Sequence, residues 1–196
     1  MDSGAWWGLL DAYTVTEWKP TEAKPKIKWE KLKGKDYTNY DRPHDVPMTT
    51  GIKAGKITSN GYEAVTFLKD LLDGKEEKIF IHNYGDFTQS VLVNAEALGR
   101  HMDKEGFLRT KYYPFLIETI KDPYEIWASF EKSSVDGSVV LREYLIKGFE
   151  LENDKKRGCF VVLQSINGKL ETWTFVYTSQ LDALNKRRVG ILLYGK

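Results

Sequence analysis

The sequence is poor in cysteine and in long apolar runs. Cys159 is the one cysteine among 196 residues, which excludes an internal disulfide framework and a cysteine-rich zinc site. No apolar run approaches the ~20 residues that span a bilayer, and no basic segment followed by an apolar core marks a secretory signal at the N-terminus. We therefore expect neither a membrane span nor a signal peptide in this chain.

Several catalytic motifs are also missing. The sequence holds no GxxxxGK[ST], no HExxH, no GxSxG and no carboxylate cluster with metal-ligand spacing. The missing carboxylates argue against a two-metal nuclease. The formal net charge is only +1, so a nucleic-acid partner must be argued from local patches.

The composition of the chain changes near residue 55. Residues 1–18 are rich in Trp, Leu and Tyr without clean periodicity, which suggests a docking segment or the tail of another domain. Residues 19–35 hold seven Lys against two Glu, a local charge of +5, with two prolines. A solvated linker is favoured over an arm that touches a nucleic-acid backbone. We expect residues 1–55 to be an irregular linker or docking segment and residues 56–196 to form the domain.

Apolar periodicity predicts the elements of that domain. Helical spacing, with caps at Asn60 and Asn94 and a proline at 114, predicts helices near 60–72, 95–102 and 115–121. A hairpin of strands 78–83 and 88–93 is expected between the first two. After Tyr124 the pattern changes to alternation, with hairpin turns at Asp136-Gly137 and Asn167-Gly168. The expected strands are 125–130, 139–146, 158–165, 169–177 and 189–194, with a short helix over 180–187. This is an α+β fold, with N-terminal helices packed on an antiparallel β-sheet meander.

Polar residues interrupt the apolar strands between Ser138 and Tyr194, which is typical of a surface that binds phosphate. Alternation places Arg142 and Tyr144 on one strand face and Lys147 on the other, unless a bulge intervenes near Gly148. In the strand over 169–177, it places an aromatic core face opposite a threonine face. The two sets are Trp173, Phe175 and Tyr177, and Thr172, Thr174 and Val176.

Histidine supplies the candidate proton-transfer groups. His101 is either a helix-terminal cation that favours the helix dipole or a general acid or base, and the spacing does not decide between them. His82, at the end of a strand, is the second candidate, whereas His44 between Pro43 and Asp45 is interpreted as a loop residue. Cys159 is expected to be a small buried hydrophobe.

These segments together resemble a known nuclease group. The order of His101, YPFLIETIKDPYEIW, LREYLIKGF, a strand with Thr174 and RRVGILLY resembles the phage-associated nucleases of the barnase–EndoU–colicin–RelE superfamily. Such nucleases occur as C-terminal toxin modules of phage Mu protein F-like proteins and polymorphic toxins. The resemblance covers roughly residues 59–194. It implies helices packed on an antiparallel sheet and metal-independent RNA cleavage, without a cofactor, on that sheet.

The resemblance also implies the site residues. It places His101 as base or acid, Lys147 and Arg188 as phosphate stabilisers, Thr174 as a phosphate-orienting hydroxyl and Tyr144 as stacker or proton relay. Further substrate contacts are expected from Arg142, Thr172, Thr178 and Arg187. Cleavage would proceed by attack of the ribose 2′-OH on the adjacent phosphate, leaving a cyclic phosphate.

The resulting hypothesis is an endoribonuclease toxin, with tRNA as a candidate substrate, that acts in the cytoplasm of a target cell. It would be delivered by secretion or by a phage as part of a longer protein, and an acidic immunity protein would neutralise it. Two alternatives stay open at this point: a nucleic-acid-binding module without catalysis, and a phage structural or interaction domain.

Overall fold

The computed structural model describes residues 36–84, 87–105, 107–132, 137–152, 155–166 and 169–196, with the backbone alone at 36, 84, 87 and 101–105. The Trp-rich and Lys-rich segments predicted over 1–35 lie outside these residues. So do Asp136, Asn167 and Gly168 of the predicted turns. Among the described helices, none is long and apolar enough to cross a membrane.

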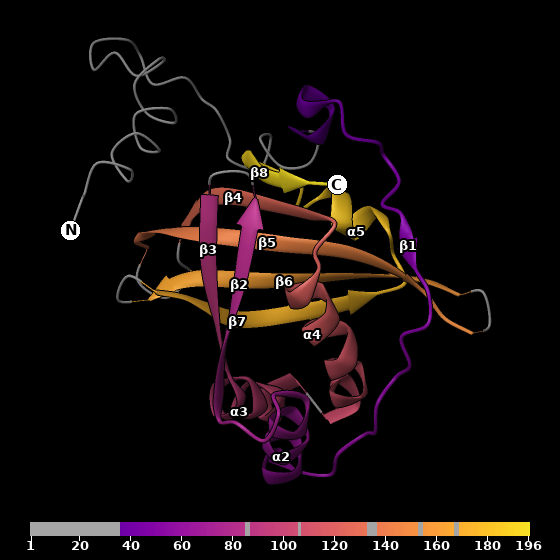
Figure 1. Cartoon of the computed structure of the whole chain (residues 1–196), viewed down its shortest axis with the longest axis vertical. Helices are drawn as coiled ribbons and strands as arrows, with labels where there is room; N and C mark the ends of the chain where they lie inside the picture. Colours follow the sequence, from indigo (N-terminus) through magenta and orange to yellow (C-terminus); the bar gives the residue numbers. More distant parts are fainter. Residues whose placement is uncertain (1–35, 85–86, 106, 133–136, 153–154, 167–168) are drawn as a thin grey trace. The chain divides into compact units, whose positions relative to one another are not determined.

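A single eight-stranded sheet organises the described chain (Figure 1). The strand order is β2-β3-β7-β6-β5-β4-β8, and β1 pairs with β5 beside this path. The bounds are β1 Met48–Thr49, β2 Glu77–Tyr84, β3 Phe87–Asn94, β4 Glu125–Lys132, β5 Val139–Glu150, β6 Lys156–Ile166, β7 Lys169–Thr178 and β8 Ile191–Gly195.

The predicted meander is confirmed, because β4, β5, β6 and β7 pair antiparallel in sequence order. The prediction of a purely antiparallel sheet is wrong. β3 pairs parallel to β7 and β1 pairs parallel to β5, each over two residue pairs, so the sheet is mixed. Both parallel strands come from outside the meander and reach it through long connections, which alternation within a segment does not report.

The helices pack on one face of the sheet. They are α2 (Gly61–Leu71), α3 (Ala95–Glu105), the 3₁₀ turn η3 (Phe107–Tyr112) and α4 (Tyr113–Lys121). Asn60 caps α2 by accepting from the Glu63 backbone N–H at 3.0 Å, and Asn94 caps α3 in the same way. The predicted helices are confirmed, but they do not all precede the sheet. The β2–β3 hairpin lies between α2 and α3 in the chain and crosses the meander strands on the helical side (Figure 1).

The larger apolar core lies between these helices and the sheet. Leu68, Phe115, Leu145, Val161 and Phe175 are among its fully buried members. The Cys159 thiol is also buried there, and burial raises its pKa to about 12, so the prediction of an inert core cysteine is confirmed. We call this side the helical face of the sheet.

The opposite face carries a second, smaller core. Trp127, Tyr144, Ile146, Phe160 and Val162 are buried on it. Two short segments cover them: residues 36–49, which contain the 3₁₀ turn η2 (Asp36–Tyr40) and β1, and the turn of helix α5 (Asp182–Asn185). We call residues 36–49 the N-terminal strap and this side the strap face.

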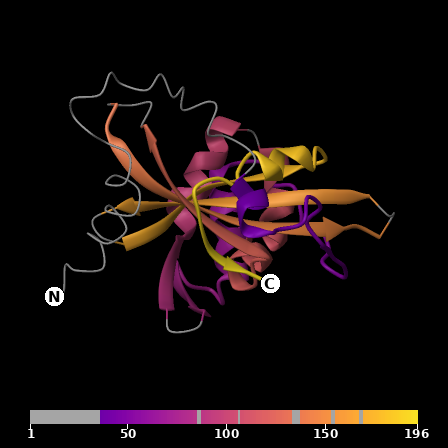
Figure 2. The same cartoon turned by 90° about the horizontal axis from the view of Figure 1, so that it is seen from above.

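The strap and the C-terminal segment lie side by side, as Figure 2 shows in indigo and yellow. Tyr37 and Val46 of the strap are buried in the strap-face core, and Arg42 donates to the Lys196 carbonyl oxygen at 2.6 Å. Residues 36–55 were expected to belong to an irregular linker. The structure instead includes the strap in the same compact unit as the sheet.

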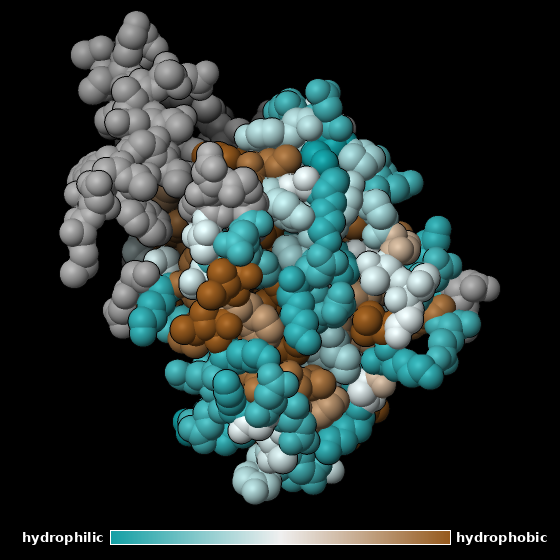
Figure 3. Space-filling view, viewed as in Figure 1, coloured by the Kyte–Doolittle hydropathy of each residue, from teal (hydrophilic) through white to brown (hydrophobic). Residues whose placement is uncertain are grey.

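The outer surface of the β2–β3 hairpin is apolar (Figure 3). Ile79 and Ile81 on β2 are well exposed, and β2 is the edge of the sheet. Nothing described packs over these two side chains.

Candidate active site

The strap face carries a cluster of charged and phenolic groups where β4 and β5 extend beyond the second core. The Glu131 carboxylate accepts hydrogen bonds from the Tyr144 hydroxyl and, at 3.1 Å, from Arg142 Nη1. The Glu131 and Arg142 side chains remain 20% and 24% exposed. A carboxylate has about four acceptor sites, so Glu131 keeps capacity for a further donor from solvent or substrate.

A second arginine, Arg187, also contacts Tyr144 on the strap face. The Arg187 guanidinium lies 5.3 Å from the ring centroid of Tyr144 and 5.3 Å from that of Phe160. Its Nη1 is 3.4 Å from the Tyr144 hydroxyl oxygen. Burial raises the pKa of Tyr144 to about 12, and the adjacent Glu131 adds to this, so the phenol is protonated at neutral pH and donates to Glu131.

Two buried polar atoms of the cluster lack a hydrogen-bond partner. Ser129 and Arg142 are directly opposite each other on β4 and β5. Ser129 Oγ and Arg142 Nε are both inaccessible and unpaired. Native proteins pair the large majority of such groups, and a catalytic role is one recognised explanation for an exception.

Cross-strand register brings Thr174 into line with this cluster. Tyr144 pairs with Val162 on β6, and Val162 pairs with Thr174 on β7, so the three side chains share the strap face. Neighbouring strands lie about 4.8 Å apart, which puts the backbones of Thr174 and Tyr144 about 10 Å apart. Thr174 thus belongs to the rim of the cluster.

A β-bulge separates Thr172 from Thr174. The register between β6 and β7 shifts at Val162/Leu163, so Thr172 pairs with Leu163 of the helical-face core. The prediction that Thr172 and Thr174 share a face is therefore wrong. Trp173 sits in the bulge and is 46% exposed, so it is not part of an aromatic core face, whereas Phe175 is fully buried as predicted.

Lys147 lies on the helical face, away from Arg142. No register shift occurs along β5, so no bulge lies near Gly148. The prediction that Arg142 and Lys147 lie on opposite faces of the strand is confirmed. Lys147 is 3% exposed, and its ammonium group lies 2.9 Å from Glu118 and 2.8 Å from Asp122 of the α4 segment. The structure does not bring Lys147 together with Tyr144 and Arg142.

Arg188 is buried beside the cluster, and its guanidinium group is hydrogen-bonded to protein acceptors. Its Nε and Nη2 each donate to the Glu125 carboxylate at 2.7 Å. Its Nη1 donates to the His44 carbonyl oxygen and to Asn185 Oδ1, and its Cζ lies over the Tyr37 ring, 4.3 Å from the ring centroid. Arg188 is 0% exposed, so a phosphate cannot reach it in this arrangement. The structure places its neighbour Arg187, not Arg188, next to Tyr144.

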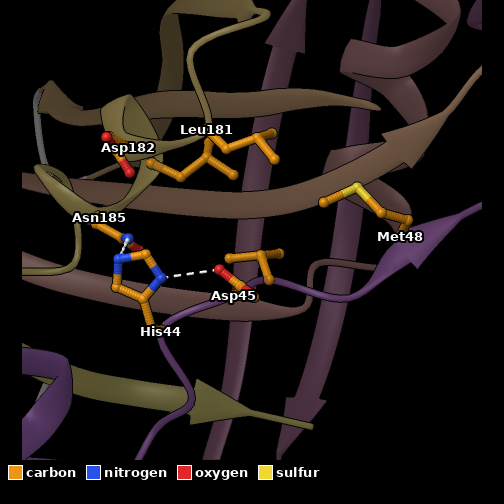
Figure 4. Close-up of a pocket in the computed structure, with 8 residues that line it drawn as sticks. His44, Asp45, Met48, Leu181, Asp182 and Asn185 are labelled. Atoms are coloured by element: carbon orange, nitrogen blue, oxygen red, sulfur yellow. Dashed lines mark hydrogen bonds and ion pairs between the residues drawn. The ribbon is translucent and has the colours of Figure 1, made fainter. Parts of the chain in front are cut away.

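The histidines are dispersed. His101 belongs to α3 in the helical layer, and its side chain lies outside the described residues. His82 is buried on β2, where burial lowers its pKa and the charge of Asp122 partly opposes this. His44 lines a small pocket with Asp182 and Asn185; its interior of about 30 Å³ has room for one or two waters (Figure 4).

Thr178, the remaining predicted contact, ends β7. Its hydroxyl accepts from the Gln180 backbone N–H at 3.0 Å and so closes a local turn. The structure therefore groups Arg142, Tyr144, Thr174 and Arg187 on the strap face, and it places Lys147, Thr172 and α3 on the helical side.

Sequence reasoning missed Glu131, the carboxylate at the centre of the cluster. The signal was present, because Glu125, Trp127, Ser129 and Glu131 alternate along β4 and so share a face. That face had to be the strap face, since Tyr144 pairs with Trp127. Among the described residues, no group of three or more His, Cys, Asp or Glu side chains is arranged to hold a metal ion.

One family of known proteins matches this chain. A family described as phage-Barnase-EndoU-ColicinE5/D-RelE like nuclease 2 matches residues 66–195. That range contains all of β3 to β8, and hence Glu131, Arg142, Tyr144, Thr174 and Arg187. Searches of curated proteins and of solved structures each returned no match. Since the matched range is most of the chain, this protein belongs to the phage-Barnase-EndoU-ColicinE5/D-RelE like nuclease 2 family.

Proposed function

We propose that this nuclease is a metal-independent endoribonuclease toxin whose active site is the strap-face cluster. The observation that carries the proposal is one partly exposed carboxylate, Glu131, which is bonded to Arg142 and linked to Arg187 through the Tyr144 hydroxyl. A base and two fixed cations are what cleavage through a neighbouring 2′-OH requires.

Glu131 is the proposed general base. It takes the proton of the ribose 2′-OH, whose oxygen then attacks the adjacent phosphorus. The P–O5′ bond breaks, a proton is transferred to the departing 5′ oxygen, and the products are a 2′,3′-cyclic phosphate and a 5′-hydroxyl. Positioned acid–base groups contribute about 10²–10⁴-fold to such a step.

Arg142 and Arg187 are the proposed phosphate ligands. Guanidinium groups match phosphate oxygens bidentately and stay charged at every relevant pH. Tyr144 is buried, so we assign it a positioning role: its hydroxyl holds the Glu131 carboxylate and its ring supports Arg187. Thr174, at the rim, keeps the proposed role of orienting a phosphate.

The contacts of the remaining predicted site residues do not favour the roles predicted for them. Arg187 replaces Arg188 in this proposal, because Arg188 is fully buried and each of its three guanidinium nitrogens donates to a protein acceptor. Lys147 is paired with carboxylates on the helical face, so we give it no contact with RNA. The predicted role of His101 as base or acid is not part of this proposal, because α3 lies on the helical side, across the sheet from the cluster.

The biological setting follows from the same chemistry. An RNase active in the cytoplasm of a target cell must be held inactive in its producer, and we propose an immunity protein that covers Glu131 and the two arginines. Carboxylates on that partner would pair with Arg142 and Arg187 in place of phosphate. Transfer RNA is the first substrate to test.

The test is incubation of the protein with total tRNA and ribosomal RNA in EDTA, followed by mapping of the ends. We expect fragments that carry cyclic phosphates, and we expect Glu131→Gln and Arg187→Gln to lose them. The control is Glu152→Gln, which alters an exposed carboxylate paired with Lys53. Full-rate cleavage by both variants would contradict the proposed site, and RNA binding without cleavage would identify a binding module instead.

A further inference from the structure

We infer that the N-terminal strap is a positioning element of the active site, which locks Arg188 and thereby holds Arg187 over Tyr144. The inference rests on the role proposed above for Arg187. It concerns residues 36–49, which precede the range matched by the nuclease family.

The strap reaches Arg188 through two direct contacts and one that passes through Glu125. Arg188 Cζ lies 4.3 Å from the centroid of the Tyr37 ring, and the His44 carbonyl oxygen accepts from Arg188 Nη1 at 3.1 Å. Arg42 Nε donates to Glu125 Oε1 at 2.8 Å, and Glu125 is the carboxylate that binds Arg188 bidentately. One buried carboxylate is thus shared by an arginine of the strap and an arginine of the C-terminal segment.

The strap also holds the turn that precedes these arginines. Asn185 Nδ2 donates to His44 Nε2 at 3.2 Å, while Asn185 Oδ1 accepts from Arg188. His44 Nδ1 is 2.8 Å from Asp45, which fixes the ring with its proton on Nδ1 (Figure 4). Leu184 is buried in the strap-face core, to which Tyr37 and Val46 also belong.

Arg187 is the next residue in this locked segment. Among the described residues, its own side chain is held by the aromatic contacts and the long 3.4 Å approach to the Tyr144 hydroxyl. Its position therefore depends on the segment 185–188, which the strap holds through the side chains of Asn185 and Arg188. A misplacement of about 1 Å in a catalytic group can cost about 10²-fold in rate.

The test is a double-mutant cycle between the strap and Arg187. Arg42→Gln removes the bonds to Glu125 and to Lys196, and Arg100→Gln is the matched control because Arg100 pairs on the surface with Glu96. We expect Arg42→Gln to lower kcat/KM for RNA cleavage about tenfold in the wild-type background. In the Arg187→Gln background it should have little further effect, since coupled residues are not additive.

Equal losses in both backgrounds would overturn the inference, because the strap would then act only through general stability. Arg42→Lys should restore part of the activity. If Arg42→Gln does not fold, His44→Ala takes its place in the cycle, since that side chain is 63% exposed.

A readout that does not depend on RNA separates this inference from the proposed function. The rate at which phenylglyoxal modifies Arg187, measured by peptide mass spectrometry, should rise several-fold in Arg42→Gln and remain unchanged in Arg100→Gln. An unchanged rate in both would refute the positioning role. If the wild-type protein cleaves no RNA while the modification rate rises as expected, the proposed function fails and the structural coupling stands.

Discussion

Arg142 and Lys147 lie five residues apart on β5 and project to opposite faces of the sheet, Arg142 toward Glu131 and Lys147 toward Glu118 and Asp122. The two cations therefore belong to different environments. One is partly exposed beside a carboxylate with free acceptor capacity, and the other is buried and neutralised by two carboxylates.

Substitution of these two residues should separate catalysis from stability. Arg142→Gln is expected to lower kcat/KM about 10²–10³-fold, the loss typical of one fixed transition-state donor, with a small change in Tm. Lys147→Met should lower the free energy of unfolding by about 1–3 kcal/mol and leave kcat/KM near that of wild type. Kinetics and denaturant unfolding on both proteins measure this, and the reverse pattern would place the site on the helical face.

Glu131 is the proposed base, so its charge matters more than its shape. Glu131→Gln keeps the acceptor for Tyr144 but cannot take a proton, and we expect kcat to fall about 10²–10⁴-fold. Tyr144→Phe should have a smaller effect, because it loosens Glu131 without removing the base. Single-turnover RNA cleavage measures both, with Glu152→Gln as the exposed control. Equal activity of Glu131→Gln and wild type would rule out this base.

Glu143 makes stability depend on pH. Burial on the helical face raises its pKa to about 7, although Gln89 Nε2 donates to it and opposes the rise. In the unfolded chain the pKa is near 4.5, so between about pH 4.5 and 7 the folded state holds a proton that the unfolded state has released. This contribution is fully present below pH 4.5 and is lost as the pH rises through 7.

The Glu143→Gln variant should not show this decrease in the free energy of unfolding as the pH rises. We expect the variant to exceed wild type in the free energy of unfolding by about 3 kcal/mol at pH 8, and the difference to shrink toward pH 4.5. Urea unfolding at pH 4.5, 6 and 8 measures this dependence. A difference that does not change with pH would show that ionisation of Glu143 is not its cause.

Gly148 is required by the strap rather than by a bulge. A Cβ there would lie 2.6 Å from the Pro47 carbonyl oxygen and 2.9 Å from Met48 Sδ, because β1 runs close against β5. We expect Gly148→Ala to destabilise the protein by about 1–3 kcal/mol by displacing the strap. Adding Met48→Ala should not restore stability, since the closest atom is backbone.

Gly158→Ala offers the matched comparison. There the three atoms nearest to the Cβ would all belong to the Leu184 side chain, at 2.7–2.8 Å. Truncation in Leu184→Ala should relieve that clash, so the double variant should lose less stability than the two single losses combined. Thermal unfolding of the single and double variants tests both glycines. Rescue of Gly148→Ala by Met48→Ala would contradict the backbone explanation.

Local patterns predicted the elements because their causes are local. Asn60, Asn94 and Pro114 mark helix starts through hydrogen bonds and backbone geometry within one turn, and alternation marks β4 to β7. Alternation also separated Arg142 from Lys147 correctly. It failed at Trp173, because one inserted residue reverses the faces and a bulge leaves no reliable local signal.

The site was harder to predict because its partners are distant in sequence. Arg187 and Arg188 are adjacent residues of the same type, so the sequence does not show which of them is buried in an ion pair. The answer depends on the position of Glu125, which is 63 residues away from Arg188 in the chain. Glu131 was overlooked because a single acidic residue at a strand end is ordinary on a surface. Glu131 becomes a candidate only through its hydrogen bonds with Tyr144 and Arg142 on the neighbouring strand.

The strap has a consequence for the order of folding. Its partners, Glu125, Gly148, Asn185, Arg188 and Lys196, all follow it in the chain by more than 80 residues. Loop-closure entropy disfavours such long-range contacts until the meander and α5 have formed. The strap is therefore synthesised before its partners, and we expect it to dock after the meander has formed. On a ribosome, the proposed site would stay incomplete until the C-terminal segment has emerged, because Arg187 and three of the residues that hold the strap belong to that segment.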